Sequence, residues 1–395
     1  ACPVPGGRGW LILCPFLRTF TKCFILLYMK RELEIYVHIP FCVKKCDYCD
    51  FLSAPAGEDV QSAYVEQLLR ETEGASALAV THEVSTVFIG GGTPSILPAC
   101  QIPRILGKIR EIFPLRKDAE ITIEANPGTM DAEKLHAWRE AGVNRLSIGL
   151  QSADNRELRL LGRIHTWEEF LDNFRLAREA GFRNINVDLM SALPGQTCRG
   201  WINTLEKVLE LHPEHISAYS LIIEEGTPFY SRYEEHPELL PAEDADRRMY
   251  EDTRRILHEH GYERYEISNY ARPGYECRHN LGYWSRTEYK GFGLGAASLL
   301  GRVRTANQSD LKEYLAGNYA GEREELSEQA VREEYFFLGL RKMEGVDPEP
   351  YRAHYRELLD RLQEQHLIEE KNGRICLTNR GIDVSNYVLA QFLDD

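Results

Sequence analysis

Short β-rich runs alternate with amphipathic helical runs from Leu33 to about Thr227. The helical runs carry helix punctuation, because Asp131 opens one as a cap and glycines close two of them. The expected strands are Leu33–Ile39, Val84–Gly90, Ala119–Ala125, Arg145–Leu150, Asn184–Met190 and His215–Ile222. Strand–helix units in this succession predict a parallel sheet with right-handed crossovers, whose working face lies at the carboxyl ends of the strands.

The pattern divides the chain into four expected parts. Residues 29–240 form the α/β core. Residues 241–325 form a connecting region with a helix at Ala242–His260, followed by irregular strands and loops over Glu263–Ser298. Residues 326–395 predict two helices and a β-hairpin with a turn at Asn372-Gly373, as in a winged-helix module. Residues 1–28 are interpreted as upstream translated sequence before Met29, with a disordered or packed arm as the alternative.

Composition restricts the functional classes. The net charge of -14 argues against a nucleic-acid backbone as the main partner. Ten cysteines in 395 residues are too few for a disulfide scaffold and predict a reducing, cytoplasmic location. The apolar run near the N-terminus is too short to span a membrane, which needs about 20 residues.

The strongest chemical signal is the run Cys42-Val-Lys-Lys-Cys46-Asp-Tyr-Cys49 directly after the first strand. Its spacing, C-x3-C-x2-C, offers three thiolates in one loop. Most electron-transfer [4Fe–4S] clusters take four, so three would leave one iron open. Structural zinc is the alternative, but zinc usually takes four ligands in two paired knuckles, and no second knuckle occurs in this sequence.

This cysteine run resembles the signature of the radical S-adenosylmethionine (SAM) superfamily. The resemblance implies a [4Fe–4S] cluster on Cys42, Cys46 and Cys49, with the amino and carboxylate groups of SAM on the open iron. It also implies the fold, which is α/β: a partial, open (β/α)6 barrel with a smaller C-terminal helical or winged-helix domain.

Further positions resemble the branch formed by oxygen-independent coproporphyrinogen III oxidases and related heme chaperones. The resemblance runs from about Arg31 to the C-terminus and implies a set of residues around SAM. These residues are Tyr36, Tyr48, Gly91, Gly92, Thr93, Glu124, Gln151, Arg163, Asp188 and Ala297. Each has a structural alternative, such as a capping carboxylate for Glu124 or Asp188 and a helix-end cation for Arg163.

Two features separate the relatives within that branch. The oxidases carry a further cysteine two residues after the triad, and Phe51 stands there in this chain. The run His279-Asn280-Leu-Gly-Tyr283-Trp284 resembles a motif of the chaperones, which implies heme binding by His279, Tyr283 and Trp284. An imidazole can ligate heme iron and aromatic rings can pack on a porphyrin. A core histidine with aromatic neighbours is the alternative.

The sequence therefore favours a heme chaperone on a radical SAM scaffold, with coproporphyrinogen III oxidation as the second hypothesis. The expected cofactors are the [4Fe–4S] cluster, SAM and heme. The expected partners are a heme-accepting client and an electron donor such as flavodoxin or ferredoxin, with no nucleic acid. Transient contact with a membrane-bound client and a dimer belong to the same hypothesis.

Overall fold

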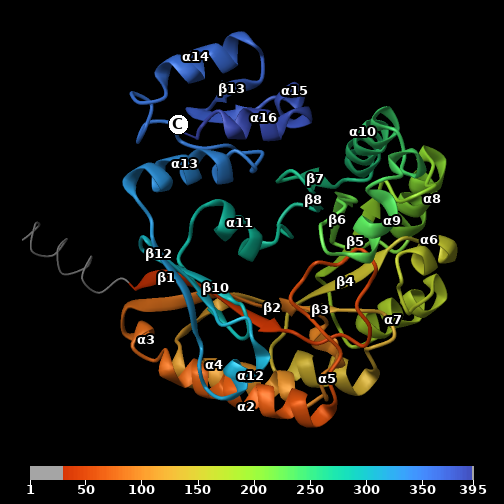
Figure 1. The fold of residues 1–395 in the computed structure, drawn as a ribbon, viewed down its shortest axis with the longest axis vertical. Coiled ribbons are helices and arrows are strands. Elements are labelled where there is room, and N and C mark those ends of the chain that lie inside the picture. The colour runs from red at the N-terminus through yellow and green to blue at the C-terminus, as the bar shows by residue number, and fades with distance from the viewer. Residues whose placement is uncertain (1–29, 394–395) are drawn as a thin grey trace, which may run out of the picture.

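A twelve-stranded sheet forms the centre of the computed structural model, which describes residues 30–393 (Figure 1). Six parallel strands lie side by side in chain order at its middle. They are β1 (Arg31–Ile39), β2 (His82–Gly91), β3 (Leu115–Ala125), β4 (Arg145–Gln151), β5 (Ile185–Ser191) and β6 (His215–Ser220). The two edge strands of the sheet do not pair with each other, so the barrel is open. The predicted strands and their parallel order are confirmed.

The crossovers between these strands are helical, as the sequence pattern predicts. They contain α2 (Glu58–Gly74), α3 (Leu78–Thr81), the 3-10 turn η1 (Pro94–Ile96), α4 (Gln101–Ile112), α5 (Ala132–Glu140), α6 (Asn155–Leu160), α7 (Trp167–Glu179) and α8 (Cys198–Leu209). Asp131 accepts the Lys134 backbone N–H at the start of α5, and Thr166 forms a capping box with Glu169 at the start of α7.

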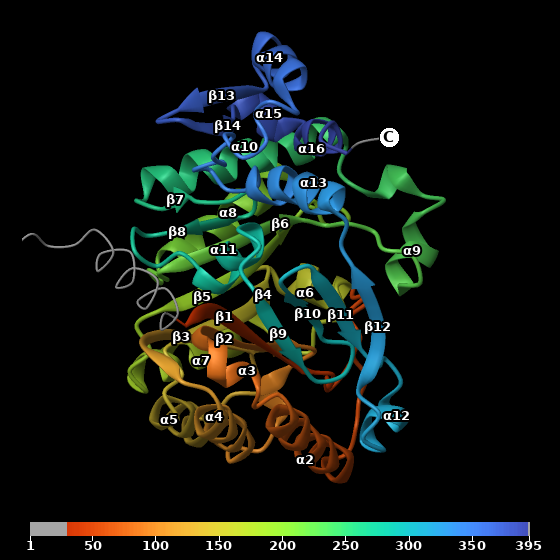
Figure 2. The same ribbon diagram turned by 90° about the vertical axis from the view of Figure 1, so that its left-hand side faces the viewer.

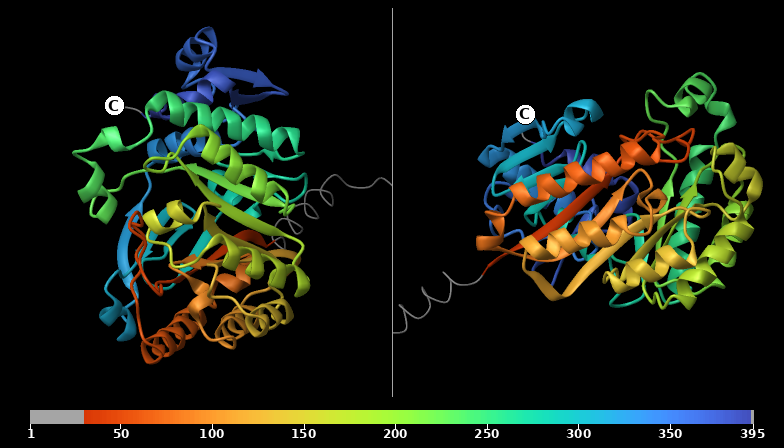
Figure 3. Two further views of the ribbon diagram at one scale, coloured as in Figure 1. Left: turned by 90° about the vertical axis from the view of Figure 1, so that its right-hand side faces the viewer. Right: turned by 90° about the horizontal axis from the view of Figure 1, so that it is seen from below.

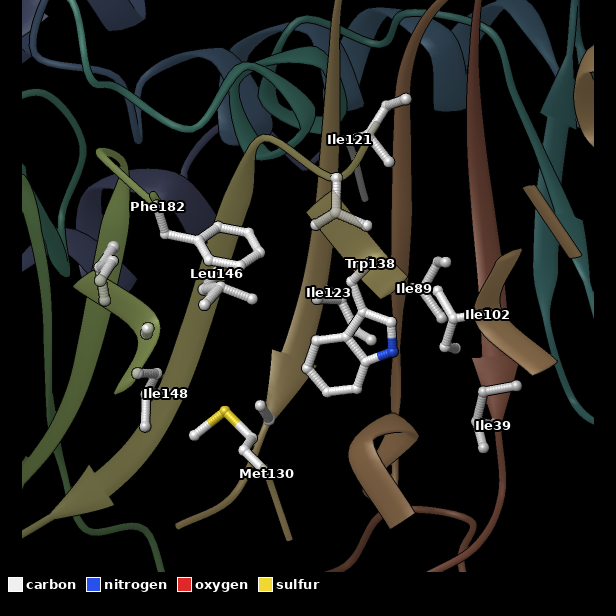
Figure 4. Close-up of a cluster of buried hydrophobic side chains, with 14 of the residues drawn as sticks. Ile39, Ile89, Ile102, Ile121, Ile123, Met130, Trp138, Leu146, Ile148 and Phe182 are labelled. Carbon is white, nitrogen blue, oxygen red and sulfur yellow. The ribbon is translucent and has the colours of Figure 1, made fainter. Parts of the chain in front are cut away.

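One face of the sheet packs against these helices and forms the main core. Figure 4 shows Ile89 of β2 and Ile123 of β3 beside Ile102 of α4 and Trp138 of α5, all of them fully buried. Burial of each such side chain contributes about 1.5–3 kcal/mol. Alternate residues of the same strands face the other way and are largely polar. That polar face is where the candidate site lies.

The region 241–325 extends this sheet at both edges instead of forming a separate layer. It adds α10 (Glu243–Glu259) with β7 (Glu263–Arg264) and β8 (Asn269–Ala271) beside β6. On the β1 side it adds β9 (Tyr289–Phe292), β10 (Ala297–Leu300), β11 (Val303–Asn307), α12 (Leu311–Leu315) and β12 (Ala320–Glu325). The expectation of irregular strands and loops throughout 263–298 is wrong for residues 278–284, which form the helix α11 (Arg278–Trp284).

The C-terminal module has its own core. It contains α13 (Glu328–Gly339), α14 (Arg356–Glu364), the hairpin β13 (Ile368–Lys371) and β14 (Arg374–Leu377), α15 (Asn379–Asp383) and α16 (Ser385–Ala390). Figures 2 and 3 show it at the end of the molecule opposite α2, α4 and α5, next to α10. Arg247 of α10 pairs with Asp383 at 2.9 Å. The predicted arrangement of two helices followed by a hairpin is present.

Two short elements, α9 (Pro228–Tyr233) and η2 (Pro237–Leu239), connect β6 to α10. Within residues 30–393, none of the helices has the length and apolar character needed to cross a bilayer. The interpretation of residues 1–28 as an upstream extension falls outside the described part of the chain.

Candidate functional site

The three predicted cysteine ligands lie on one loop that is fastened at both ends. Cys42 follows β1 directly, and its backbone N–H donates to Ala54 O at 3.2 Å. Midway along the loop, Asp47 N–H donates to Leu161 O at 3.1 Å. Cys42, Cys46 and Cys49 are free thiols that line one pocket at the carboxyl ends of the strands. The sequence-predicted loop therefore has a fixed path over the sheet.

The glycine-rich turn after β2 packs directly against this loop. Gly92 N–H donates to Ile39 O at 2.9 Å and Thr93 N–H donates to Phe41 O at 2.7 Å. A Cβ atom at Gly92 would lie 2.6 Å from Phe41 O and 3.0 Å from Cys42 Sγ. Any side chain there would push the cysteine loop away, so this glycine is needed for the close approach.

Two partly buried carboxyl groups face the same pocket. Glu124 ends β3 and accepts the Gly91 N–H at 3.0 Å. Burial, with Asp188 nearby, raises the pKa of Glu124 to about 8. Burial also raises the pKa of Asp188, which accepts Asn186 Nδ2 at 2.7 Å. The nearby Arg145 lowers both pKa values, but burial has the larger effect. A positively charged ligand in the pocket would therefore favour the ionised forms of both carboxyls.

Arg163 joins the cysteine loop to the strands. Its Nη2 donates to Asn126 Oδ1 at 2.7 Å and to Gly149 O at 2.5 Å, while Nη1 donates to Cys46 Sγ at 3.6 Å. Asn126 in turn donates to Thr93 Oγ1 at 2.8 Å. The guanidinium thus fixes the Cys46 Sγ atom relative to β4 and to Asn126. The interpretation of Arg163 as a solvated helix-end cation does not fit these contacts.

The structure brings most of the sequence-predicted site residues into this pocket. They are Cys42, Cys46, Tyr48, Cys49, Gly91, Gly92, Thr93, Glu124, Gln151, Arg163 and Asp188. Gln151 reaches it from a left-handed backbone conformation, with φ of 74°, at a β-bulge ending β4. Asn126, Ser147 and Gly149 also line the pocket and were not predicted as site residues. Asn126 lies two residues after Glu124 in the run Glu124-Ala-Asn-Pro127, so its position in the sequence could have identified it as a site residue.

Two predicted SAM residues do not line the pocket. Tyr36 lies on β1, and its hydroxyl is 3.0 Å from His38 Nδ1 on the same strand. Ala297 lies at the start of β10, paired with Ala306 of β11, and its carbonyl oxygen packs against Gly291. Their part in cofactor binding stays a prediction.

The predicted heme residues lie on α11, on the polar side of the sheet and away from the cysteine pocket. His279 is 1% exposed, stacks on Phe88, and places Nδ1 2.7 Å from Thr86 Oγ1. Tyr283 meets the His279 ring edge to face at a centroid distance of 4.8 Å. Burial lowers the pKa of His279 to about 3, so the imidazole is neutral. Its Nε2 is buried and has no hydrogen-bond partner.

Glu34 is the acidic neighbour of this helix. Its Oε2 lies 3.9 Å from His279 Nδ1 and has no hydrogen-bond partner in the structure. Burial, with Glu32 and Glu120 nearby, raises the pKa of Glu34 to about 9. The carboxyl is therefore protonated in the folded protein at neutral pH, while in the unfolded chain it is ionised.

This shift predicts how stability depends on pH. The folded state binds the Glu34 proton more tightly, so this residue lowers the free energy of unfolding as pH rises from about 4.5 towards 9. Replacement of Glu34 by glutamine removes that dependence and should stabilise the protein by up to about 3 kcal/mol at pH 7. Urea unfolding of both proteins at pH 5 and pH 8 measures the difference. An equal difference at both pH values would contradict the shifted pKa.

The residues present fit an iron–sulfur cluster better than a single ion. Within residues 30–393, no three His, Cys, Asp or Glu side chains converge on a point that one metal ion could occupy. A cubane binds its thiolates at separate corners, so its three cysteines need not converge on one point. Because Gly92 has no side chain, only its backbone lies beside Cys42 Sγ. The donor set thus provides three sulfur ligands and open space.

Comparisons with known proteins give the same class. Residues 36–208 match the Radical SAM superfamily, and residues 326–384 match the HemN C-terminal domain. The chain is 38% identical to the heme chaperone HemW of Lactococcus lactis, covering 93% of this chain and 99% of the relative. It is 41% identical to HemW of Escherichia coli, covering 80% and 84%. The crystallised coproporphyrinogen III oxidase HemN of Escherichia coli is similar at a TM-score of 0.80 and 27% identity, covering 95% and 93%.

An open α/β barrel with three cysteines on the loop after its first strand defines a radical SAM protein, a class that implies a [4Fe–4S] cluster and SAM. Within that class, the chain belongs to the HemW family.

Proposed function

We propose that this protein binds heme and delivers it to a client hemoprotein, on a radical SAM scaffold. The observation that carries the proposal is the similarity to HemW proteins over nearly the whole chain, named as heme chaperones. The replacement of the oxidase cysteine by Phe51 supports it. The partners that follow from this function are a heme-accepting client and a one-electron donor.

The cofactor sites belong to the same proposal. Cys42, Cys46 and Cys49 would hold the cluster, and the pocket residues named above would surround SAM. When bound, these groups would supply the chemistry for reductive cleavage of the SAM sulfonium. The chain's own contribution is to present three thiols and to place Glu124 and Asp188 where a cationic ligand would favour their ionised forms. Arg163 stabilises the Cys46 sulfur.

His279 is the proposed heme ligand. A proton on Nδ1, donated to Thr86 Oγ1, leaves the Nε2 lone pair available, and neutral imidazole is the form that binds iron. The burial of His279 adds a requirement to the proposal: α11 must change its packing before Nε2 can meet a heme. Tyr283 and Trp284 would then pack on the porphyrin.

Heme titration followed by absorption spectroscopy tests this assignment. The His279→Ala variant should lose at least about tenfold in heme affinity, since an iron–imidazole bond is removed. The matched control is His136→Ala, an exposed histidine on α5 paired with Glu140. Unchanged heme affinity in His279→Ala would assign the heme to other residues.

Oxidation of coproporphyrinogen III is the second candidate function. It is favoured by the similarity of this fold to the Escherichia coli oxidase over 95% of the chain. Incubation of the anaerobically reconstituted protein with coproporphyrinogen III and SAM separates the two functions. The chaperone proposal expects no turnover, and rapid formation of protoporphyrinogen would replace it with the oxidase.

A further inference from the structure

The cysteine loop presents a group of exposed side chains to solvent. We define the loop face as Val43, Lys44, Lys45 and Ile164. Val43 is 56% exposed and Ile164 is 51% exposed, and both lysines are exposed. Large apolar side chains held in water at one spot are typical of an interaction site.

A small hollow in the loop face leads to a cluster ligand. Val43, Lys44 and Ile164 line it together with Cys46 and Arg163. Ile164 and Val43 stand outside the lining of the larger pocket proposed for SAM. Cys46 therefore contributes to the inner pocket and also to the outer surface. Lys44, Thr93, Asn126 and Arg163 also line both pockets, so the hollow adjoins the SAM pocket and gives a second approach to Cys46.

The loop face is positive in a protein whose net charge is -14. Lys45 Nζ donates to Phe51 O at 2.8 Å, which fixes its ammonium group at the surface. The nearby carboxylate of Asp47 is paired with Arg232 at 3.2 Å, so Asp50 is the remaining exposed acid of the loop. Two lysines beside apolar side chains suit an acidic protein partner.

We propose that the loop face docks a small acidic electron-carrier protein, which reduces the cluster through the Cys46 side. The inference rests on the cluster proposed above. The carrier loses one electron and the cluster gains it, so the step needs no proton and no further reactant. Electron-transfer encounters use small interfaces, below about 1,200 Å², and depend on charge for their association rate. A four-residue patch with lysines meets both conditions.

Flavodoxin, an acidic carrier, is the probe for this surface. The Lys45→Glu variant should bind oxidised flavodoxin at least about tenfold more weakly than wild type at low ionic strength, measured by isothermal titration calorimetry. The difference should vanish at about 1 M salt, where charges are screened beyond about 3 Å. Ile164→Glu tests the same face from outside the cysteine loop and should also weaken binding. Lys117→Glu, at the opposite end of β3, is the control with the same type of charge change.

Reduction kinetics give a second readout. Flavodoxin hydroquinone should reduce the cluster of both loop-face variants at least about tenfold more slowly than that of wild type, with dithionite reduction unchanged. Equal flavodoxin affinity in all variants, or an equal loss in Lys117→Glu, would overturn the proposal. Loss of heme delivery without loss of flavodoxin binding would assign the face to the client instead. Because binding of oxidised flavodoxin involves no heme, a failure of the heme proposal is seen separately in the heme titration.

Discussion

Replacing Cys46 by serine should leave the purified protein with less than about a tenth of the wild-type iron and sulfide. The proposed cluster has only three thiolate ligands, and this variant removes one of them. Serine keeps the size of the side chain but is a poor ligand for iron in such clusters. SAM affinity should fall by more than about tenfold in the same variant, since its chelating iron is lost. Iron and sulfide analysis with equilibrium dialysis of SAM measures both.

Cys100→Ser is the matched control for this experiment. Cys100 is exposed, precedes α4, and does not line the cysteine pocket. The control should retain iron, sulfide and SAM affinity. Full iron and sulfide in Cys46→Ser would contradict the three-thiolate account, because another residue would then be completing the cluster.

Replacing Gly282 by alanine should destabilise the fold by about 1–3 kcal/mol, the usual cost of overpacking a buried site. A Cβ atom at this position would overlap the carboxyl group of Glu34, which is 2% exposed and held on β1. The helix α11 therefore needs glycine where it crosses the first strand. Thermal or urea unfolding measures the loss, and heme affinity should fall with it if α11 carries the heme ligand.

A rescue variant and a control sharpen this prediction. Glu34→Ala combined with Gly282→Ala makes room for the new methyl group and should recover most of the stability. Gly107→Ala, inside α4, has no atom within 4 Å of its added Cβ. It should stabilise the protein by about 0.5–1 kcal/mol, since alanine is the better helix former. Destabilisation of both glycine variants to the same extent would remove the steric explanation.

The sequence could predict the central strands and the position of the site because both depend on local patterns. The run Ala119–Ala125 reads as a strand from its alternation, and parallel strands bring their carboxyl ends to one edge. The meeting of these residues in one pocket could therefore be predicted without any knowledge of side-chain packing. The residues concerned are Cys42, Gly91, Glu124 and Asp188.

Tertiary contacts decide what the sequence could not predict. Residues 278–284 contain Gly282 and aromatic residues, which are weak helix formers, so α11 depends on its packing against β2 and β1. The same packing buries His279, a fact that the His279–Trp284 run does not reveal. The strands β9 to β12 are short, and they join the sheet because β9 pairs with β1, more than 200 residues away in the sequence.

The measurement that tests the central claim most directly is metal and sulfide analysis of protein purified without air, with electron paramagnetic resonance of the dithionite-reduced sample. The account predicts about four iron and four sulfide per chain, and a signal of the reduced cluster that changes when SAM is added. Zinc in place of iron, or protein without inorganic sulfide, would contradict it.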